Sequence, residues 1–222
     1  MKRAAGASEQ APGRLRPEKQ QAIMAGGRTV FARDGYARAS IDAIAAASGV
    51  STRTIYKHFA DKASLFAAVI NHSAGQIADA EIALIATHLA PVTAAGQVEA
   101  ALLAFATEWL DDRGAWLAGI PHAIEHRALI SQVQAEAGHV GEQVIAEWWR
   151  SGPGRVRAEQ AALFADWGKA GLLRIPDSEQ AAVHFSALVA VIPGPPGTSL
   201  SAADRRGWVA SGVRLFVRGH QP

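Results

Sequence analysis

Side chains suited to binding chemistry gather in one short segment, residues 51 to 62. Hydroxyl, phenol, imidazole and cationic groups are supplied there by Ser51, Thr52, Arg53, Thr54, Tyr56, Lys57, His58 and Lys62. An arginine can bond the O6 and N7 atoms of one guanine together, and a threonine can contact a base edge or a thymine methyl group. We therefore expect all of these side chains to belong to a DNA-binding surface, with Arg53 and Thr52 in contact with DNA bases. Tyr56, Lys57 and His58 lie farther along and are expected to bind phosphate oxygens.

Two short helices joined by a tight turn, Ser40 to Phe59, must position this segment. Ser40 is a favoured N-cap for the first helix, which ends at Gly49, and Ser51 is a favoured N-cap for the second. Ile55 and Phe59, four residues apart, mark the buried side of the second helix. This is the pattern of a helix-turn-helix, whose second helix has the width to enter the major groove of DNA.

The charge of the chain is divided unevenly. Residues 1–62 carry 11 Lys and Arg against 5 Asp and Glu, whereas residues 63–222 carry 11 against 15, so +6 is followed by −4. A basic first part is typical of a protein that binds a polyanion. We expect residues 1–16 to form a flexible basic tail. Ser40 and Lys62, each at the start of a helix, are expected to add phosphate contacts.

The composition of the chain is that of helices. Alanine and leucine recur with glutamate, glutamine and arginine, and no long segment alternates polar and apolar residues as a half-buried strand does. We expect an all-α chain, with a three-helix DNA-binding domain at 17–66 and a larger helical domain for ligand binding and dimerisation at 67–222. A fourth helix is expected to begin after Asp61, and further helices at about 76–89, 94–111, 116–137, 140–150, 156–171, 178–192 and 201–218.

The run from Phe31 to Phe66, FARDGYARASIDAIAAASGVSTRTIYKHFADKASLF, combines a Gly-Val turn with a Tyr-x-x-Phe that is followed by Lys. In these features the segment resembles the N-terminal domain of the TetR family of bacterial repressors. The resemblance implies a protein of nine or ten helices that forms a dimer and binds an operator with two half-sites. It also implies release of the DNA when a small molecule binds the C-terminal domain. A non-specific DNA-binding protein is the alternative that the basic N-terminus alone would allow.

A second motif suggests a different chemistry. His122, Glu125 and His126 spell H-x-x-E-H, in which two histidines bind zinc and the glutamate acts as a base in inverted zincin peptidases. Such an enzyme needs a third protein ligand, and nothing in the sequence marks one. We therefore expect no catalytic residue, no metal site and no cofactor. The alternatives are a metal-responsive regulator and, more remotely, a metallopeptidase.

Aromatic residues concentrate in the larger domain, where all six tryptophans lie after residue 100. Some of them are expected to line an apolar cavity for an unknown small-molecule inducer, although core packing is the alternative for each. The candidates for this ligand site are Phe105, Trp109, Trp116, His122, His126 and Trp148.

The last two helices are predicted to form a homodimer interface. Apolar stripes are expected from Val183, Leu188, Val189 and Ile192 on one helix and from Trp208, Gly212, Leu215 and Phe216 on the other. Paired across a two-fold axis, the stripes would make a four-helix bundle. The alternative is that both stripes face the core of their own domain.

The cellular location is also constrained by composition. The chain has no cysteine, which excludes disulfides, thiolate nucleophiles and cysteine-type zinc sites. It has no secretory h-region and no run of about 18 apolar residues that would span a membrane. We expect a cytoplasmic protein whose partners are a palindromic DNA operator, a second copy of itself and the inducer, with no membrane.

Overall fold

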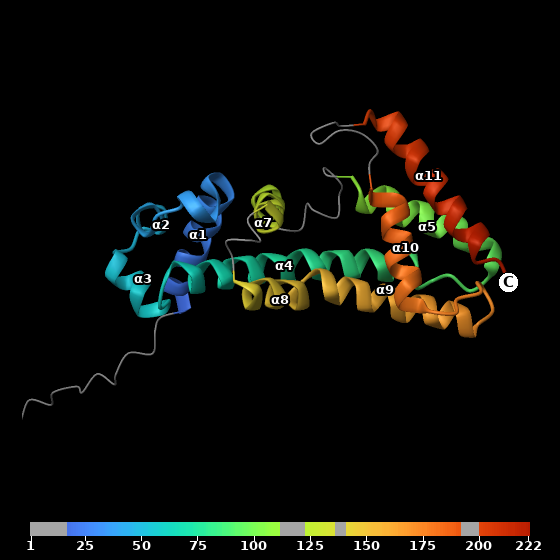
Figure 1. Ribbon diagram of the computed structural model, residues 1–222, viewed down its shortest axis with the longest axis horizontal. Helices are drawn as coiled ribbons and strands as arrows, with labels where there is room; N and C mark the ends of the chain where they lie inside the picture. The colour runs from blue at the N-terminus through green and yellow to red at the C-terminus, as the bar shows by residue number, and fades with distance from the viewer. Residues whose placement is uncertain (1–16, 112–122, 136–140, 192–199) are drawn as a thin grey trace, which may run out of the picture.

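The computed structural model describes residues 17–111, 123–135, 141–191 and 200–222, and the regular structure of these residues is α-helical throughout. The helices are α1 (Pro17–Arg38), α2 (Ile41–Ser48), α3 (Thr52–His58), α4 (Lys62–His88), α5 (Ala95–Trp109), α7 (Ala123–Ala135), α8 (Glu142–Ser151), α9 (Pro153–Lys169), α10 (Ser178–Ala190) and α11 (Ala202–Gly219). Figure 1 shows α1 to α3 at one end of an elongated molecule and α5, α10 and α11 at the other. The all-α prediction is confirmed.

Helix α4 connects the two ends. The fourth helix and the separate helix predicted at 76–89 form one continuous helix of 27 residues. Gly75 does not interrupt it, because a single glycine weakens a helix interior by only about 1 kcal/mol relative to alanine. Asp61 and Ser64 form a reciprocal capping box at its start. Neither α4 nor any other described helix is both long and apolar enough to cross a membrane.

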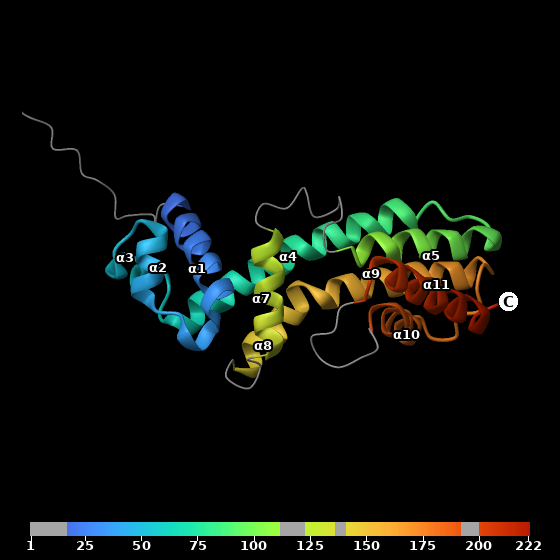
Figure 2. The ribbon, with the colours of Figure 1, turned by 90° about the horizontal axis from the view of Figure 1, so that it is seen from above.

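Helices α8 and α9 run beside α4, as both views show (Figures 1 and 2). The gap between the helices predicted at 140–150 and 156–171 is reduced to Gly152, which separates α8 and α9. A Cβ atom built at Gly152 would lie 2.7 Å from the Cβ atom of Ala74. Glycine is therefore required here, because it lets the α8–α9 junction approach α4 closely.

The buried apolar side chains form two cores that divide along α4. The first, which we call the N-terminal core, joins α1 to α3 with α4 as far as Ala74, and it includes Leu129 and Val133 of α7 and Trp148 of α8. The second, the C-terminal core, begins on α4 at Ala78 and continues through α5, α9, α10 and α11. The predicted domain boundary at 66/67 lies inside α4, and α7 and α8 belong to the packing of the first core.

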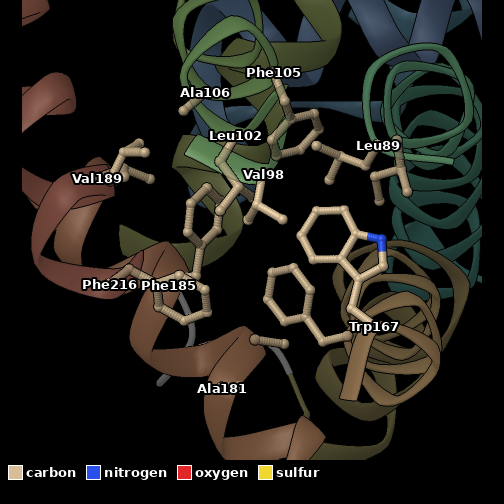
Figure 3. Close-up of a cluster of buried hydrophobic side chains, with 14 of the residues drawn as sticks. Leu89, Val98, Leu102, Phe105, Ala106, Trp167, Ala181, Phe185, Val189 and Phe216 are labelled. Carbon is tan, nitrogen blue, oxygen red and sulfur yellow. The ribbon is translucent and has the colours of Figure 1, made fainter. Parts of the chain in front are cut away.

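Aromatic rings occupy the centre of the C-terminal core (Figure 3). The Phe216 ring centroid lies 5.3 Å from those of Phe164 and Phe185, which joins α9, α10 and α11. A Cβ atom at Gly212 would collide with the carbonyl oxygen of Leu188, so this glycine permits close packing of α11 on α10 within one chain.

This packing corrects the predicted dimer stripes. Val189, Gly212 and Phe216 are buried in the chain's own core, because the close approach of α10 and α11 turns those faces toward each other. Val183, Trp208 and Leu215 stay exposed, with 39%, 37% and 61% of their surfaces accessible. Ile192 lies outside the described residues. The exposed members, rather than the whole stripes, remain candidates for a contact with a second copy.

Candidate DNA-binding surface and C-terminal domain

Two serine caps and a glycine fix the turn between α2 and α3. The Ser40 Oγ accepts a hydrogen bond from the Ala43 N–H at 3.1 Å, and the Ser51 Oγ accepts one from the Thr54 N–H at 3.2 Å. Gly49 has φ 63° and ψ 29°, in the left-handed region that favours glycine. Both predicted caps and the predicted helix end at Gly49 are confirmed.

Helix α3 has a buried side and an exposed side. Ile55 is fully buried, and Phe59, just past the helix end, leaves only 8% of its surface exposed. The other side carries the exposed Arg53, Tyr56 and Lys57 and the half-buried Thr52, Thr54 and His58. Within the described part of the chain, no hydrogen bond or ion pair occupies the side chains of Arg53, Tyr56 or Lys57. Their donor groups are therefore available to a partner on this side.

The hydroxyl groups around α3 already have structural partners. Besides its cap, the Ser51 Oγ lies 2.9 Å from the Thr54 Oγ1 in a second hydrogen bond. A hydroxyl that accepts a backbone hydrogen bond keeps its own proton to donate. The Ser40 hydroxyl can therefore still donate to a phosphate. Ser51 and Thr54 use one of their two hydroxyl protons in the hydrogen bond that joins them. Their DNA contacts stay predictions.

Lys62 lies where its ammonium group binds carbonyl oxygens. The Nζ donates to the carbonyls of Tyr36 at 2.9 Å, Ala39 at 3.1 Å and Ala37 at 3.4 Å. It also lies 4.7 Å from the centroid of the Tyr36 ring, in a cation–π contact. An ammonium group has three donors, and all three are engaged here. The geometry therefore favours a structural role for Lys62 over the predicted phosphate contact.

The structure describes two members of the H-x-x-E-H motif, Glu125 and His126, and places them in different surroundings. The Glu125 carboxylate accepts a hydrogen bond from the Arg28 Nε at 3.0 Å, and the Thr29 hydroxyl lies 3.4 Å away. His126 is fully buried, and His122 lies outside the described residues. Among the residues that the structure describes, no group of three His, Cys, Asp or Glu side chains could hold a metal ion. The metal-based alternatives are not favoured, because an arginine occupies the carboxylate that would act as the base.

The described candidates for the ligand site do not converge on one place. Phe105 and Trp109 stack with ring centroids 5.8 Å apart, and Phe105 is fully buried in the C-terminal core. Trp148 belongs to the N-terminal core instead. Trp116, like His122, lies outside the described residues. Phe105 therefore has the packing of a core residue, and the ligand site stays a prediction.

Two buried polar side chains were not predicted from the sequence. Ser73 on α4 and Gln160 on α9 leave only 2% and 3% of their surfaces exposed. Neither breaks the apolar periodicity of its helix, so no signal in the sequence separates them from polar residues on the outer face.

The arrangement defines a class of protein. A basic module with an exposed recognition helix, joined by one long helix to an all-helical body, is the architecture of a helix-turn-helix DNA-binding regulator. A sequence model for bacterial regulatory proteins of the tetR family matches residues 23–69. A model for the C-terminal domain of AefR-like transcriptional repressors matches residues 121–222. The chain belongs to the TetR family of transcription regulators.

Solved structures share this fold. A TetR-family transcriptional regulator from Mesorhizobium loti MAFF303099 is 24% identical, with a TM-score of 0.77 over 95% of this chain and 100% of that chain. The flavonoid-responsive regulator FrrA is 25% identical, with a TM-score of 0.60 over 92% and 97%. A transcriptional regulator from Saccharomonospora viridis, solved with choline, is 20% identical, with a TM-score of 0.60 over 89% and 96%. A search of curated protein sequences finds no match.

Proposed function

We propose that this TetR-family regulator is a cytoplasmic repressor that binds a palindromic operator as a homodimer and leaves it when a small, mostly apolar inducer binds the C-terminal domain. The observation that carries the proposal is the exposed side of α3, where Arg53, Tyr56 and Lys57 have no side-chain partner among the described residues. Family membership establishes a DNA-binding regulator. Repression, induction and the roles of individual residues go beyond it.

The residues of α3 divide into two roles. Arg53 follows the cap in the first turn, where a helix in the major groove comes nearest to the base edges. A bidentate bond to guanine would give about 1–3 kcal/mol of discrimination between base pairs. Tyr56, Lys57 and His58 lie in the last turn and reach the phosphate backbone instead. Thr52 adds a contact to a base edge or a thymine methyl group.

A homodimer is supported by the exposed apolar side chains of α10 and α11. Val183 projects from α10, and Trp208 and Leu215 project from α11. A Cβ atom at Gly207 would meet nothing within 4 Å, so the surface beside Trp208 is open to a second helix. A two-fold axis at this surface would pair two recognition helices with two half-sites, which makes the operator palindromic.

An apolar inducer is supported by the character of the C-terminal domain and by one relative. The domain is rich in aromatic side chains, and apolar cavities lined by such residues bind small molecules. FrrA, which is 25% identical, is a flavonoid-responsive regulator. Aromatic compounds that carry hydroxyl groups are therefore the first class of inducer to test on this chain.

The proposal is tested by selecting bound sequences from random duplex DNA with the purified full-length chain. A palindrome with half-sites about 34–36 Å apart should be enriched, since two recognition helices of a dimer bind one turn of DNA apart. The selected duplex is then titrated with a flavonoid panel, and release by one member supports induction. If no sequence is enriched, the chain is a non-specific DNA-binding protein and the proposal is wrong.

The two roles on α3 are separated by a matched pair of variants. Arg53→Ala should relax the preference for the selected palindrome, whereas Lys57→Ala should weaken binding to the palindrome and to random DNA alike. Both side chains are exposed, so neither change should alter the free energy of unfolding. Uniform weakening by both variants would show that the assignment of roles is wrong.

A further inference from the structure

One lysine connects the two ends of the helix-turn-helix. Ala39, whose carbonyl oxygen accepts the 3.1 Å bond from the Lys62 Nζ, directly precedes the Ser40 cap of α2. Lys62 itself is the first residue of α4, shortly after α3 ends at His58. The bond therefore closes the α2–α3 segment at its base, where it enters and leaves the rest of the domain.

The same ammonium group completes the end of α1. Gly35 has φ 76° and interrupts α1, which ends soon afterwards at Arg38, so Tyr36 and Ala37 lie in the last turn of the helix. The Lys62 Nζ binds the carbonyls of Tyr36 and Ala37, and a cation is favourable at a helix C-terminus. The Tyr36 ring under the ammonium packs on Phe66 of α4, with centroids 4.9 Å apart. The Lys62 side chain thus connects α4 to the end of α1 and to the residue before the α2 cap.

We propose that Lys62 is a positioning residue for sequence recognition, which fixes α2 and α3 relative to α4 and does not neutralise a DNA phosphate. Turning the ammonium toward a phosphate would break its three hydrogen bonds to carbonyl oxygens, which opposes that movement. The inference rests on the proposed sequence-specific binding, because positioning has a consequence only where a side chain must meet a particular base.

The two possible roles of Lys62 have different consequences for DNA binding. A phosphate contact attracts any DNA and adds about 0.9 to the slope of log affinity against log salt concentration. A positioning contact changes the placement of Arg53, whose two bonds to guanine require defined geometry, and leaves the number of neutralised phosphates unchanged. Salt dependence and sequence preference therefore report the two roles separately.

The test compares Lys62→Met with Lys57→Met in the full-length protein. Affinities are measured at several salt concentrations on a random duplex and on the duplex selected by the wild type. Lys57→Met should lower the salt slope by about 0.9. Lys62→Met should keep the wild-type slope and lower the ratio of specific to random affinity by about tenfold or more. A lower slope with an unchanged ratio, or no change in either, would overturn the proposal.

A second variant covers the case in which Lys62→Met does not fold, as judged by circular dichroism. Lys62→Arg keeps the positive charge, but a planar guanidinium cannot converge on three carbonyls as an ammonium does. It should lose sequence preference at an unchanged slope, whereas a phosphate contact would leave both at wild-type values and reject the positioning role. If the wild type itself prefers no sequence, the proposed function fails, while the slopes on random DNA still show whether Lys62 meets a phosphate.

Discussion

The two ends of the molecule use aromatic side chains differently. At the N-terminal end, Phe31 and Phe66 are buried with ring centroids 4.9 Å apart, while Tyr56 leaves 56% of its surface exposed on α3. At the C-terminal end, Phe185 and Phe216 are fully buried in the centre of the domain. On α3 itself, Ile55 is buried in the core, whereas Tyr56 lies on the exposed side that we propose contacts DNA.

This difference decides how well function can be separated from stability. A change on the exposed side of α3 should alter the proposed DNA contacts and leave the core intact. In the C-terminal domain aromatic residues fill the core, and the same residue type would line a ligand cavity. Phe105, a predicted ligand-site residue, is fully buried in the core and stacks on Trp109. A mutation there alters packing first, and its effect on ligand binding must be measured against that loss.

The largest effect is expected from Phe216→Ala. The ring is 1% exposed and lies 5.3 Å from the rings of Phe164 and Phe185, so its removal leaves a cavity that three helices cannot close. We expect the free energy of unfolding to fall by about 3–5 kcal/mol, measured by denaturant titration.

Leu215→Ala is the matched control, since Leu215 is adjacent on α11 but 61% exposed. Its effect on unfolding should grow with protein concentration if this face binds a second copy, because association stabilises the folded chain by mass action. If Phe216→Ala had the smaller, concentration-dependent effect instead, Phe216 would face a partner and the C-terminal core would be wrongly assigned.

A smaller effect is expected from Gly49→Ala in the turn before α3. A Cβ atom at Gly49 would meet nothing within 4 Å, so the cost comes only from its φ of 63°. We expect a loss of about 1–2 kcal/mol in unfolding free energy, and a smaller loss for Gly49→Asn, because asparagine tolerates the left-handed region better. Equal losses for the two variants would mean that backbone conformation is not the cause.

The sequence predicts the N-terminal module well because its signals are local. Ser40, Gly49 and Ser51 act on neighbours within a few residues, so type and spacing suffice to predict their caps and the turn. The carbonyl contacts of Lys62 were not predicted, because its partners lie 23 to 26 residues back in the chain. The partner Arg28 of Glu125 is 97 residues away, and local spacing instead suggested a zinc motif.

The C-terminal domain was predicted less completely for a related reason. An apolar stripe shows that a helix face is covered, but it does not show whether the cover is the same chain or a second copy. Val189 and Phe216 were assigned to a dimer interface and lie in the chain's own core, whereas Trp208 on the same stripe is exposed. Only the three-dimensional packing of α10 on α11 separates these cases.

An intermediate effect is expected at the N-terminal end, where Arg28 of α1 meets Glu125 of α7. The Arg28 side chain is 12% exposed and that of Glu125 is 30% exposed, so solvent weakens the pair only in part. A double-mutant cycle with Arg28→Gln and Glu125→Gln should give a coupling energy of about 1 kcal/mol in unfolding free energy.

The same pair tests the zinc interpretation of the motif. Added zinc or a chelator should leave the unfolding of the wild type unchanged, because Glu125 is engaged by an arginine rather than oriented toward a metal. A zinc-dependent rise in stability that His126→Ala abolishes would restore the metal-responsive alternative. A coupling energy near zero would show that the Arg28–Glu125 pair does not stabilise the packing of α7 on α1.

The smallest effect is expected from the capping box of Asp61, which starts the helix that joins the two ends. The Ser64 backbone N–H donates to the carboxylate at 2.7 Å and, with the Ser64 hydroxyl, holds the pKa of Asp61 below its ordinary value of 3.8. Because the folded pKa is lowered, the carboxylate stabilises the fold above pH 3.8, and this contribution is lost as the pH falls through the folded pKa. The difference in unfolding free energy between the wild type and Asp61→Ser should therefore be constant near neutral pH and shrink only below pH 3.8. Serine keeps an uncharged cap, so a difference that stayed constant down to low pH would assign the contribution to geometry rather than to charge.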